Sequence, residues 1–141
     1  MGSVLLDDNV LVALAWPAHE AHQRVGKWFA RHNRSGWATC PFTESGLVRV
    51  LSNPAFSADA LTPANALAVL GSNLSLSGHE FWPADIGLID ALRSVGRGLS
   101  GHRQLTDAYL LGLAIRHRGR FATLDRGVGA LDPGGFVETV G

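Results

Sequence analysis

The sequence predicts an α/β domain with a mainly parallel sheet. Short apolar runs of strand character alternate along the chain with longer stretches of helical periodicity. One of these helices, over residues 107–117, is apolar nearly all round and is therefore expected to lie centrally. The chain has 141 residues and contains no repeat or linker-like tract, so we expect a single domain over residues 1–141.

The amino-terminal half begins with residues 3–7, which are apolar up to an acidic pair and predict a buried strand. Asn9 can cap a helix that runs through Leu14. Pro17 interrupts that helix, because proline lacks a backbone donor and fixes φ. The further elements expected here are an amphipathic helix over 19–33, a strand over 37–40, a helix over 43–51 that Thr43 caps, and a turn at 52–54.

The carboxyl-terminal half opens with a helix at Thr62-Pro63, since proline suits the first helical position. Thr106 is expected to cap the apolar helix over 107–117. The other elements expected here are a strand over 80–82, a helix over 85–95, a glycine-rich break over 96–101, a strand over 121–124, a helical turn over 126–131 and a strand over 136–140.

Composition excludes several classes of protein. The chain is 46% hydrophobic, yet no stretch has the length and apolar character of a transmembrane helix. Its first residues lack the basic region of a signal peptide. The single cysteine, Cys40, cannot form an internal disulfide. We therefore expect a cytoplasmic protein with no membrane association.

Charge is balanced overall, with twelve basic and twelve acidic residues, but its distribution is uneven. The segment from Arg93 to Arg126 contains seven arginines and only two acidic residues, which gives it a net charge of +5. Such a segment could hold a polyanion, or it could simply be a solvated helix surface.

Four carboxylates carry the functional prediction. Asp7 and Asp125 each close an apolar, strand-like run, and Glu44 and Asp107 each follow a threonine at an expected helix start. In an open α/β fold the carboxyl ends of strands and the amino ends of helices meet at one edge of the sheet, where ligands bind. Singly, each acid has an ordinary role in a turn or at a helix terminus. Together they would repel one another unless a cation lay between them.

Hard divalent cations prefer oxygen ligands, so the four carboxylates indicate a site for Mg²⁺ or Mn²⁺ and an enzyme that acts on phosphate. We expect Asp7, Asp107 and Asp125 to hold the ion or ions. Glu44 would ligate directly or through water, or accept a proton from the nucleophile.

Three polar residues are candidates for fixing the carboxylate rotamers, namely Asn9, Thr106 and Thr123. Helix capping and strand propensity are alternative roles for them. Asp8 is left out of the site, because its side chain would point away from that of Asp7 if the segment stayed extended.

Other phosphate or metal chemistries fit less well. The acid pair Asp7-Asp8 could open a response-regulator receiver, but the only lysine, Lys27, is too early in the chain for that mechanism. The same lack of a lysine argues against a haloacid-dehalogenase phosphatase. His19 and His22 have zinc-compatible helical spacing but no recognisable third ligand.

Five runs of the sequence resemble PIN-domain nucleases, and more closely the VapC-type toxins of bacterial toxin–antitoxin pairs. The runs are Leu5–Leu14, Trp16–His22, Ala38–Pro54, Leu105–Leu111 and Ala122–Gly127, in the family's order and across nearly the whole chain.

The resemblance implies a three-layer α/β/α sandwich and a Mg²⁺- or Mn²⁺-dependent endoribonuclease that cuts RNA, typically a structured tRNA or rRNA. It also implies a cognate antitoxin that fills the active groove, and a homodimer. The family's acidic quartet maps onto Asp7, Glu44, Asp107 and Asp125.

RNA contacts would come from arginines near the expected site, with Arg49, Arg103 and Arg126 as candidates. A second class of function stays open. The chain could be a catalytically weak binding module that acts mainly in an antitoxin complex regulating its own operon.

Overall fold

A computed structural model of the chain describes residues 2–95 and 99–141. Five short strands form one parallel sheet in the order β3-β2-β1-β4-β5. The strands are β1 (Val4–Leu6), β2 (Trp37–Thr39), β3 (His79–Phe81), β4 (Arg120–Thr123) and β5 (Val137–Thr139). Because every pairing is parallel, the carboxyl ends of all five strands lie at the same edge of the sheet.

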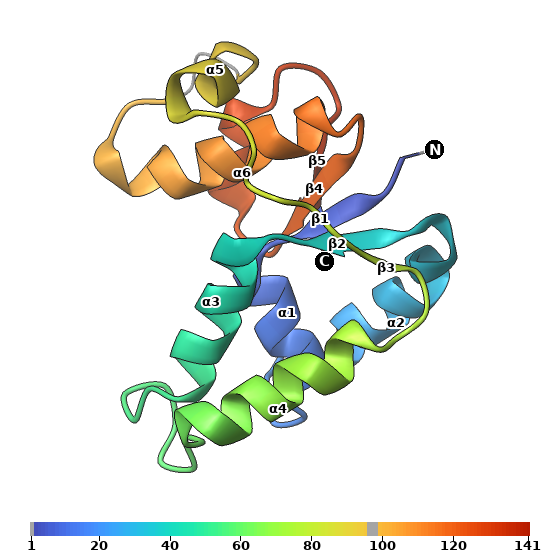
Figure 1. Cartoon of the computed structure of the whole chain (residues 1–141), viewed down its shortest axis with the longest axis vertical. Helices are drawn as coiled ribbons and strands as arrows, with labels where there is room; N and C mark the ends of the chain where they lie inside the picture. Colours follow the sequence, from blue (N-terminus) through green and yellow to red (C-terminus); the bar gives the residue numbers. More distant parts are fainter. Residues whose placement is uncertain (1, 96–98) are drawn as a thin grey trace.

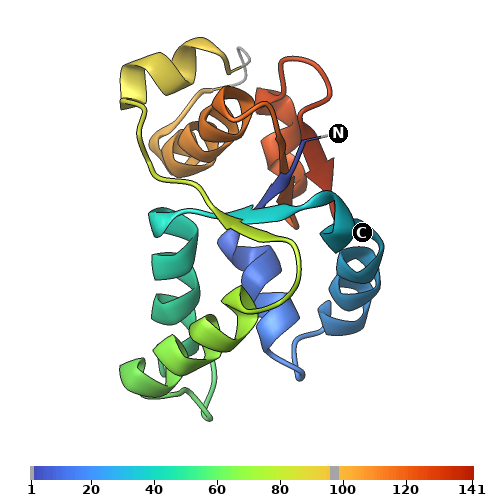
Figure 2. The same cartoon turned by 45° about the vertical axis from the view of Figure 1, so that its right-hand side comes forward.

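Helices cover both faces of this sheet, as Figure 1 shows. On one face lie α1 (Asp8–Ala15), α2 (His22–His32), α3 (Pro41–Leu51) and α4 (Pro63–Leu74); on the other lie α5 (Leu88–Arg93), α6 (Leu105–Arg116) and the 3₁₀ segment η3 (Arg126–Leu131). The turned view of Figure 2 separates these two groups along the line of the sheet. Two shorter 3₁₀ turns, η1 (Asn33–Ser35) and η2 (His102–Gln104), precede β2 and α6. The predicted three-layer sandwich is confirmed.

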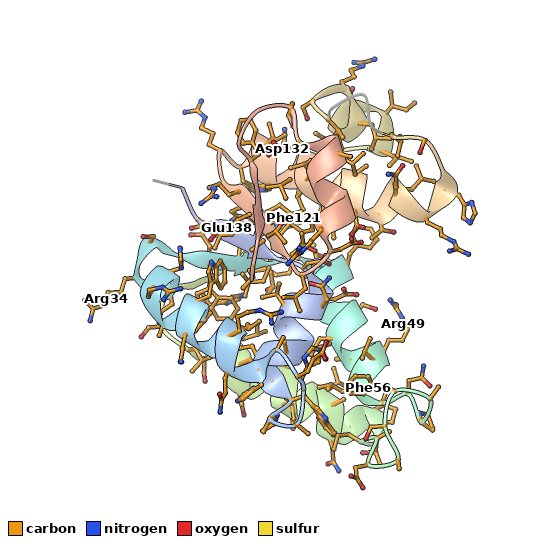
Figure 3. The ribbon with its side chains drawn as sticks, turned by 180° about the vertical axis from the view of Figure 1, so that it is seen from behind. Arg34, Arg49, Phe56, Phe121, Asp132 and Glu138 are labelled. Carbon is orange, nitrogen blue, oxygen red and sulfur yellow. The ribbon has the colours of Figure 1, made fainter. Side chains whose placement is uncertain are left out.

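The alternation of side chains along each strand explains the two layers. Val4 and Leu6 point into the hydrophobic cluster beneath α1 to α4, whereas Leu5 between them joins the cluster beneath α5 and α6. Phe121 pairs with Leu5 across the sheet and is fully buried in that second cluster (Figure 3). Both faces of the central strands are thus apolar, as a parallel sheet covered on both sides requires.

The buried helix α6 confirms the prediction for its apolar run, because every residue from Ala108 to Ala114 is buried. Among the described residues, no helix is long and apolar enough to cross a membrane. Cys40 is fully buried, and three of the four tryptophans lie in the core.

Several predicted helix starts are wrong. Asp7, not Asn9, caps α1, because its Oδ1 accepts from the backbone N of Asp8 at 2.8 Å. Helix α3 begins at Pro41, so Thr43 lies inside its first turn and bonds back to Cys40. Thr106 likewise lies within the helix that it was expected to cap, because the chain is already helical at Leu105 after η2.

Other boundaries are shorter than expected. The helix predicted over 19–33 starts only at His22, because residues 17–21 form turns after Pro17. The helix predicted over 85–95 is confined to Leu88–Arg93. The glycine-rich break predicted over 96–101 lies partly outside the described residues.

Candidate active site

Asp7 lies at the carboxyl end of the central strand β1 and is almost fully buried. Its backbone N donates to the carbonyl of Ala122 on β4, which continues the sheet pairing up to the functional residue. Burial, together with the neighbouring carboxylates of Asp8 and Asp107, raises the pKa of Asp7 to about 8, against a hydrogen bond from Thr123 that lowers it. A carboxylate is thus held where its own charge is unfavourable in the absence of a cation.

A hydrogen-bond network fixes the orientation of the Asp7 carboxylate. The Thr123 hydroxyl donates to Asp7 Oδ2 at 2.7 Å and accepts from Asn9 Nδ2 at 3.2 Å and from the backbone N of Asp125 at 3.0 Å. Asn9 Oδ1 in turn accepts from the backbone N of Leu124 at 3.0 Å. Thr123 thus contacts the Asp7 carboxylate directly, whereas Asn9 reaches it only through Thr123, and the two residues tie the end of β4 to the start of α1.

Asp107 approaches Asp7 from the other face of the sheet, on the first turn of α6. Both carboxylates line a cavity of about 330 Å³, which is also lined by Asp8, Thr106 and Arg49. Half-burial and the nearby carboxylates of Asp125 and Asp8 raise the pKa of Asp107 to about 6. Thr106 lines this cavity, but no hydrogen bond of its side chain is found in the described part of the chain.

Asp125 stands on the opposite side of Asp107. It follows β4 and is exposed, and its Oδ1 accepts from the backbone N of Gly127 at 2.8 Å. Asp107 and Asp125 line a second cavity of about 230 Å³ together with Arg103. Two of the other three predicted carboxylates, Asp7 and Asp125, thus each share a cavity with Asp107.

Positive charge near these carboxylates comes from arginines at the rims. Arg49 lines the first cavity and reaches outward from α3 (Figure 3), and Arg103 lines the second. Arg126 follows Asp125 directly and is exposed, but it lines neither cavity. In residues 2–95 and 99–141, no ion pair within 4.0 Å involves Asp7, Asp107 or Asp125.

The donor set fits a hard divalent cation. Every candidate ligand is a carboxylate oxygen, and no described basic side chain neutralises the carboxylates by an ion pair. No group of three or more acidic, histidine or cysteine residues in the described ranges could hold a metal ion as it stands. An ion would therefore need oxygens from water or substrate to complete its shell, as Mg²⁺ usually does.

Glu44 does not line either of these cavities. Its Oε2 accepts from the Thr39 hydroxyl at 2.6 Å, and its side chain lines a separate groove between α3 and α4. The residues of α3 that line the carboxylate cavity are Phe42, Thr43, Ser45 and Arg49. Asp107 thus shares one cavity with Asp7 and another with Asp125, whereas Glu44 lines neither cavity.

Asp8 is a cavity residue that the sequence analysis left out. That inference required an extended segment, but the helix begins at Asp8 and turns its side chain toward α3. A Cβ built on Gly46 would lie 2.4 Å from Asp8 Oδ2, so the carboxylate occupies room that a glycine leaves open. The signal that could have revealed it is Asp7, which is itself a good N-cap and would start the helix two residues earlier than Asn9 allows.

The histidine pair proposed as a weak zinc alternative has other contacts. His19 Nδ1 accepts from the backbone N of Ala21, and His22 Nδ1 lies 2.8 Å from the carbonyl oxygen of Ala13. These contacts give both rings a role in the connection between α1 and α2.

Comparison of the sequence with models of known protein families identifies the family of this chain. The family model described as PIN domain matches residues 4–132, which include all four predicted carboxylates. The chain belongs to the PIN-domain family. Among PIN-domain proteins it is of the VapC type, which the following relatives establish.

Three such relatives come from Mycobacterium tuberculosis. Ribonuclease VapC39 is 42% identical over 138 residues, covering 98% of this chain and 99% of its own. Ribonuclease VapC38 is 45% identical over 88% of this chain and 86% of its own. Ribonuclease VapC29 is 43% identical over 92% of this chain and 90% of its own.

Solved structures agree on the fold. One similar structure is VapBC2 from Rickettsia felis bound to a DNA fragment from their promoter. The PIN-domain chain superposes on a chain of that complex with a TM-score of 0.68 at 12% identity, and the match covers 96% of this chain and 97% of that chain. It superposes on a chain of DNA-bound VapBC from Salmonella typhimurium with a TM-score of 0.62 at 17% identity, over 100% of both chains.

Proposed function

We propose that this chain is an endoribonuclease toxin of the VapC type that uses Mg²⁺ or Mn²⁺ to cut RNA. The observation that carries the proposal is the position of Asp107, which lines both cavities and so links buried Asp7 on one side with Asp125 on the other. The names of the curated relatives, all ribonucleases, support the same reaction class.

In this proposal Asp7, Asp107 and Asp125 hold the cation. A divalent ion held by these residues would supply Lewis-acid polarisation of a phosphoryl oxygen and would lower the pKa of bound water. Thr123, which Asn9 holds in turn, keeps the Asp7 carboxylate in one orientation, so this ligand would be preorganised for a cation. The expectation that Glu44 ligates the ion, directly or through water, or accepts a proton stays a prediction.

The substrate class in this proposal is RNA, with a structured tRNA or rRNA expected. Arg49 and Arg103 stand at the rims of the two cavities, where a phosphodiester would need a cationic partner beside the acids. Arg126 is exposed next to Asp125 and remains a candidate for the same role.

The proposed protein partner is a cognate antitoxin. An apolar groove of about 460 Å³ adjoins the carboxylate cavity and shares Phe42 and Thr106 with it. Phe42 is 52% exposed and Leu88 is 49% exposed at this groove, which suits burial by another polypeptide. The expected homodimer and the cytoplasmic location stay predictions.

The test is metal-dependent cleavage by the purified chain. Total RNA is incubated with the chain in chelator, in Mg²⁺ and in Mn²⁺, and the same series is run with Asp107→Asn. We expect cleavage that requires the cation and that falls by at least about a hundredfold in the variant.

Circular dichroism of the Asp107→Asn chain verifies that it is folded. If both chains bind the antitoxin while neither cuts RNA, the binding module that regulates its own operon becomes the better account.

A further inference from the structure

A hydrogen-bond relay ends on the carboxylate of Glu44. Thr39, the last residue of β2, is fully buried, and its hydroxyl donates to Glu44 Oε2 at 2.6 Å. On the neighbouring strand β3, His79 Nε2 lies 2.7 Å from the same hydroxyl oxygen. The hydroxyl has one proton, which Glu44 receives, so His79 is the donor to Thr39. The relay therefore runs from His79 through Thr39 to Glu44.

The histidine at the start of the relay is anchored in the core. The His79 ring packs on Trp37 with ring centroids 4.7 Å apart, because the two residues pair in register across β2 and β3. Trp37 is almost fully buried, and its indole nitrogen donates to the carbonyl oxygen of Ser77 at 2.9 Å. The relay thus connects the first turn of α3 to the packed core of the sheet.

The threonine of the relay stands beside the proposed cation site. Leu5 of β1 pairs with Ala38 of β2 in the parallel sheet. The next residues of the two strands, Leu6 and Thr39, are therefore level, and Asp7 follows Leu6 directly. The buried hydroxyl of Thr39 and the buried carboxylate of Asp7 thus belong to neighbouring strand ends at one edge of the sheet.

The Glu44 carboxylate has one oxygen held and the other open. Oε2 accepts from the relay, whereas no hydrogen bond or ion pair of Oε1 is found among the described residues. The groove that Glu44 lines adjoins the carboxylate cavity, since Ser45 and Arg49 line both. Ordering a glutamate side chain costs rotamer entropy. Fixing the carboxylate in the free chain removes that cost from cation binding.

We propose that Thr39 and His79 are positioning residues of the cation site, and that they act by fixing the orientation of the Glu44 carboxylate. The inference rests on the proposed function, in which Glu44 belongs to the acidic quartet. Oε1 is then left for the cation or for a water that the cation holds. Partners that orient a ligand in this way commonly change metal affinity without touching the metal.

The experiment measures Mn²⁺ affinity by calorimetry in the unaltered chain and in two pairs of variants. Thr39→Val keeps the branched shape and removes the donor, whereas Thr39→Ser keeps the donor. His79→Phe keeps an aromatic ring on Trp37 and removes the donor, whereas His79→Gln keeps an N–H group. We expect the Kd for Mn²⁺ to rise about threefold or more in the two variants that lose the donor, and to stay within about twofold in the two that keep it.

A double-mutant cycle shows whether the effect acts through Glu44. Glu44→Ala alone should raise the Kd by about tenfold. Adding Thr39→Val to Glu44→Ala should cause no further rise, because the relay then has no carboxylate to orient. His32→Phe is the matched control, since His32 also stacks on a tryptophan, Trp28, with centroids 4.7 Å apart, but faces Glu138. It should leave the Kd unchanged.

Chemical denaturation verifies that each variant is folded, and the two His79 variants carry the test if Thr39→Val does not fold. RNA cleavage is measured in parallel on the same chains, so that the cation site and the nuclease are judged separately.

The outcomes separate this inference from the proposed function. Mn²⁺ binding that Asp7→Asn abolishes, but that loss of the donor at Thr39 or His79 does not weaken, overturns the relay and leaves the nuclease intact. An equal loss on Thr39→Val with and without Glu44→Ala also overturns it, because the effect is then structural. Mn²⁺ binding that depends on the relay, together with no RNA cleavage, supports the relay and rejects the nuclease. An unaltered chain that binds no Mn²⁺ rejects both.

Discussion

The Thr123 hydroxyl donates to Asp7 Oδ2 at 2.7 Å, joining the last residue of β4 to the residue that follows the neighbouring strand β1, 116 positions away in the sequence. Thr123 is fully buried and Asp7 nearly so, which leaves this hydroxyl as the donor that faces the buried carboxylate oxygen. The contact connects the geometry of the sheet directly to the orientation of the candidate ligand.

Replacing Thr123 with valine should weaken both folding and catalysis. Valine keeps the branched shape but removes the donor to Asp7 and the acceptor for Asn9, so we expect the free energy of unfolding to fall by about 1–3 kcal/mol. Chemical denaturation measures this loss. Thr123→Ser keeps the hydroxyl and should retain most of the cleavage rate, whereas equal rates for the valine and serine variants would show that the hydroxyl does not orient Asp7.

The pH dependence of stability should reveal the buried charge of Asp7. Its pKa is raised from 3.8 to about 8, so it stabilises the fold only while protonated, and this contribution is lost as the pH rises through about 8. Without divalent cations, we expect Asp7→Asn to gain stability relative to the unaltered chain between about pH 5 and about pH 8. Thermal unfolding in chelator at several pH values measures the difference.

Comparison with the variant cancels the opposite contribution of His79, whose pKa is lowered mainly by burial. Added Mn²⁺ should raise the Tm of the unaltered chain more than that of the variant. A stability difference that stays constant with pH would contradict a buried, charged Asp7.

Gly46 should prove necessary for the position of Asp8. An alanine Cβ there would lie 2.4 Å from Asp8 Oδ2 and 2.7 Å from Asp8 Cβ, so Gly46→Ala should destabilise the fold by about 1–3 kcal/mol. Gly26→Ala on α2 is the matched control, because nothing lies within 4 Å of its Cβ, and it should be neutral or stabilising by up to about 1 kcal/mol. Adding Asp8→Gly to Gly46→Ala should remove the penalty if the clash is the cause, and a penalty that persists would place the cause elsewhere.

Arg49 should contribute to RNA affinity through charge. Arg49→Glu is expected to weaken RNA binding and to reduce the slope of log affinity against log salt by about 1, since one phosphate contact is lost. Arg24→Glu, an exposed arginine on α2, is the control. Identical salt slopes for the two variants would remove Arg49 from the RNA contacts.

Much of the fold could be predicted from the sequence because strand and helix periods were clear. The apolar runs ending at Asp7 and at Asp125 were strands, and their parallel pairing brought both ends to one edge of the sheet. Helix starts were harder. Threonine is a common N-cap residue, so Thr43 and Thr106 were both reasonable candidates for the start of a helix. In the structure, however, α3 already starts at Pro41, before Thr43, and α6 already starts at Leu105, directly after η2 and before Thr106.

Positions within the site depended on packing that a sequence does not display. On α3, Gly46 lies against the Asp8 side chain, whereas Glu44 lines the groove between α3 and α4. Asp8 was missed because α1 begins two residues earlier than the predicted cap Asn9 allows, which changes the direction of the Asp8 side chain. The resemblance to PIN-domain proteins was confirmed, whereas the roles of the individual carboxylates remain predictions.

The measurement that tests the central proposal most directly is sequencing of the 5′ ends of cellular RNA after induction of the chain, compared with Asp7→Asn. We expect new ends at defined sites only with the unaltered chain, because the variant lacks the buried ligand but keeps an isosteric side chain beside Thr123. Purified chain and cation should reproduce the same ends on the same RNA. Identical end profiles for the two chains, both folded and equally abundant, would contradict a nuclease site built on Asp7.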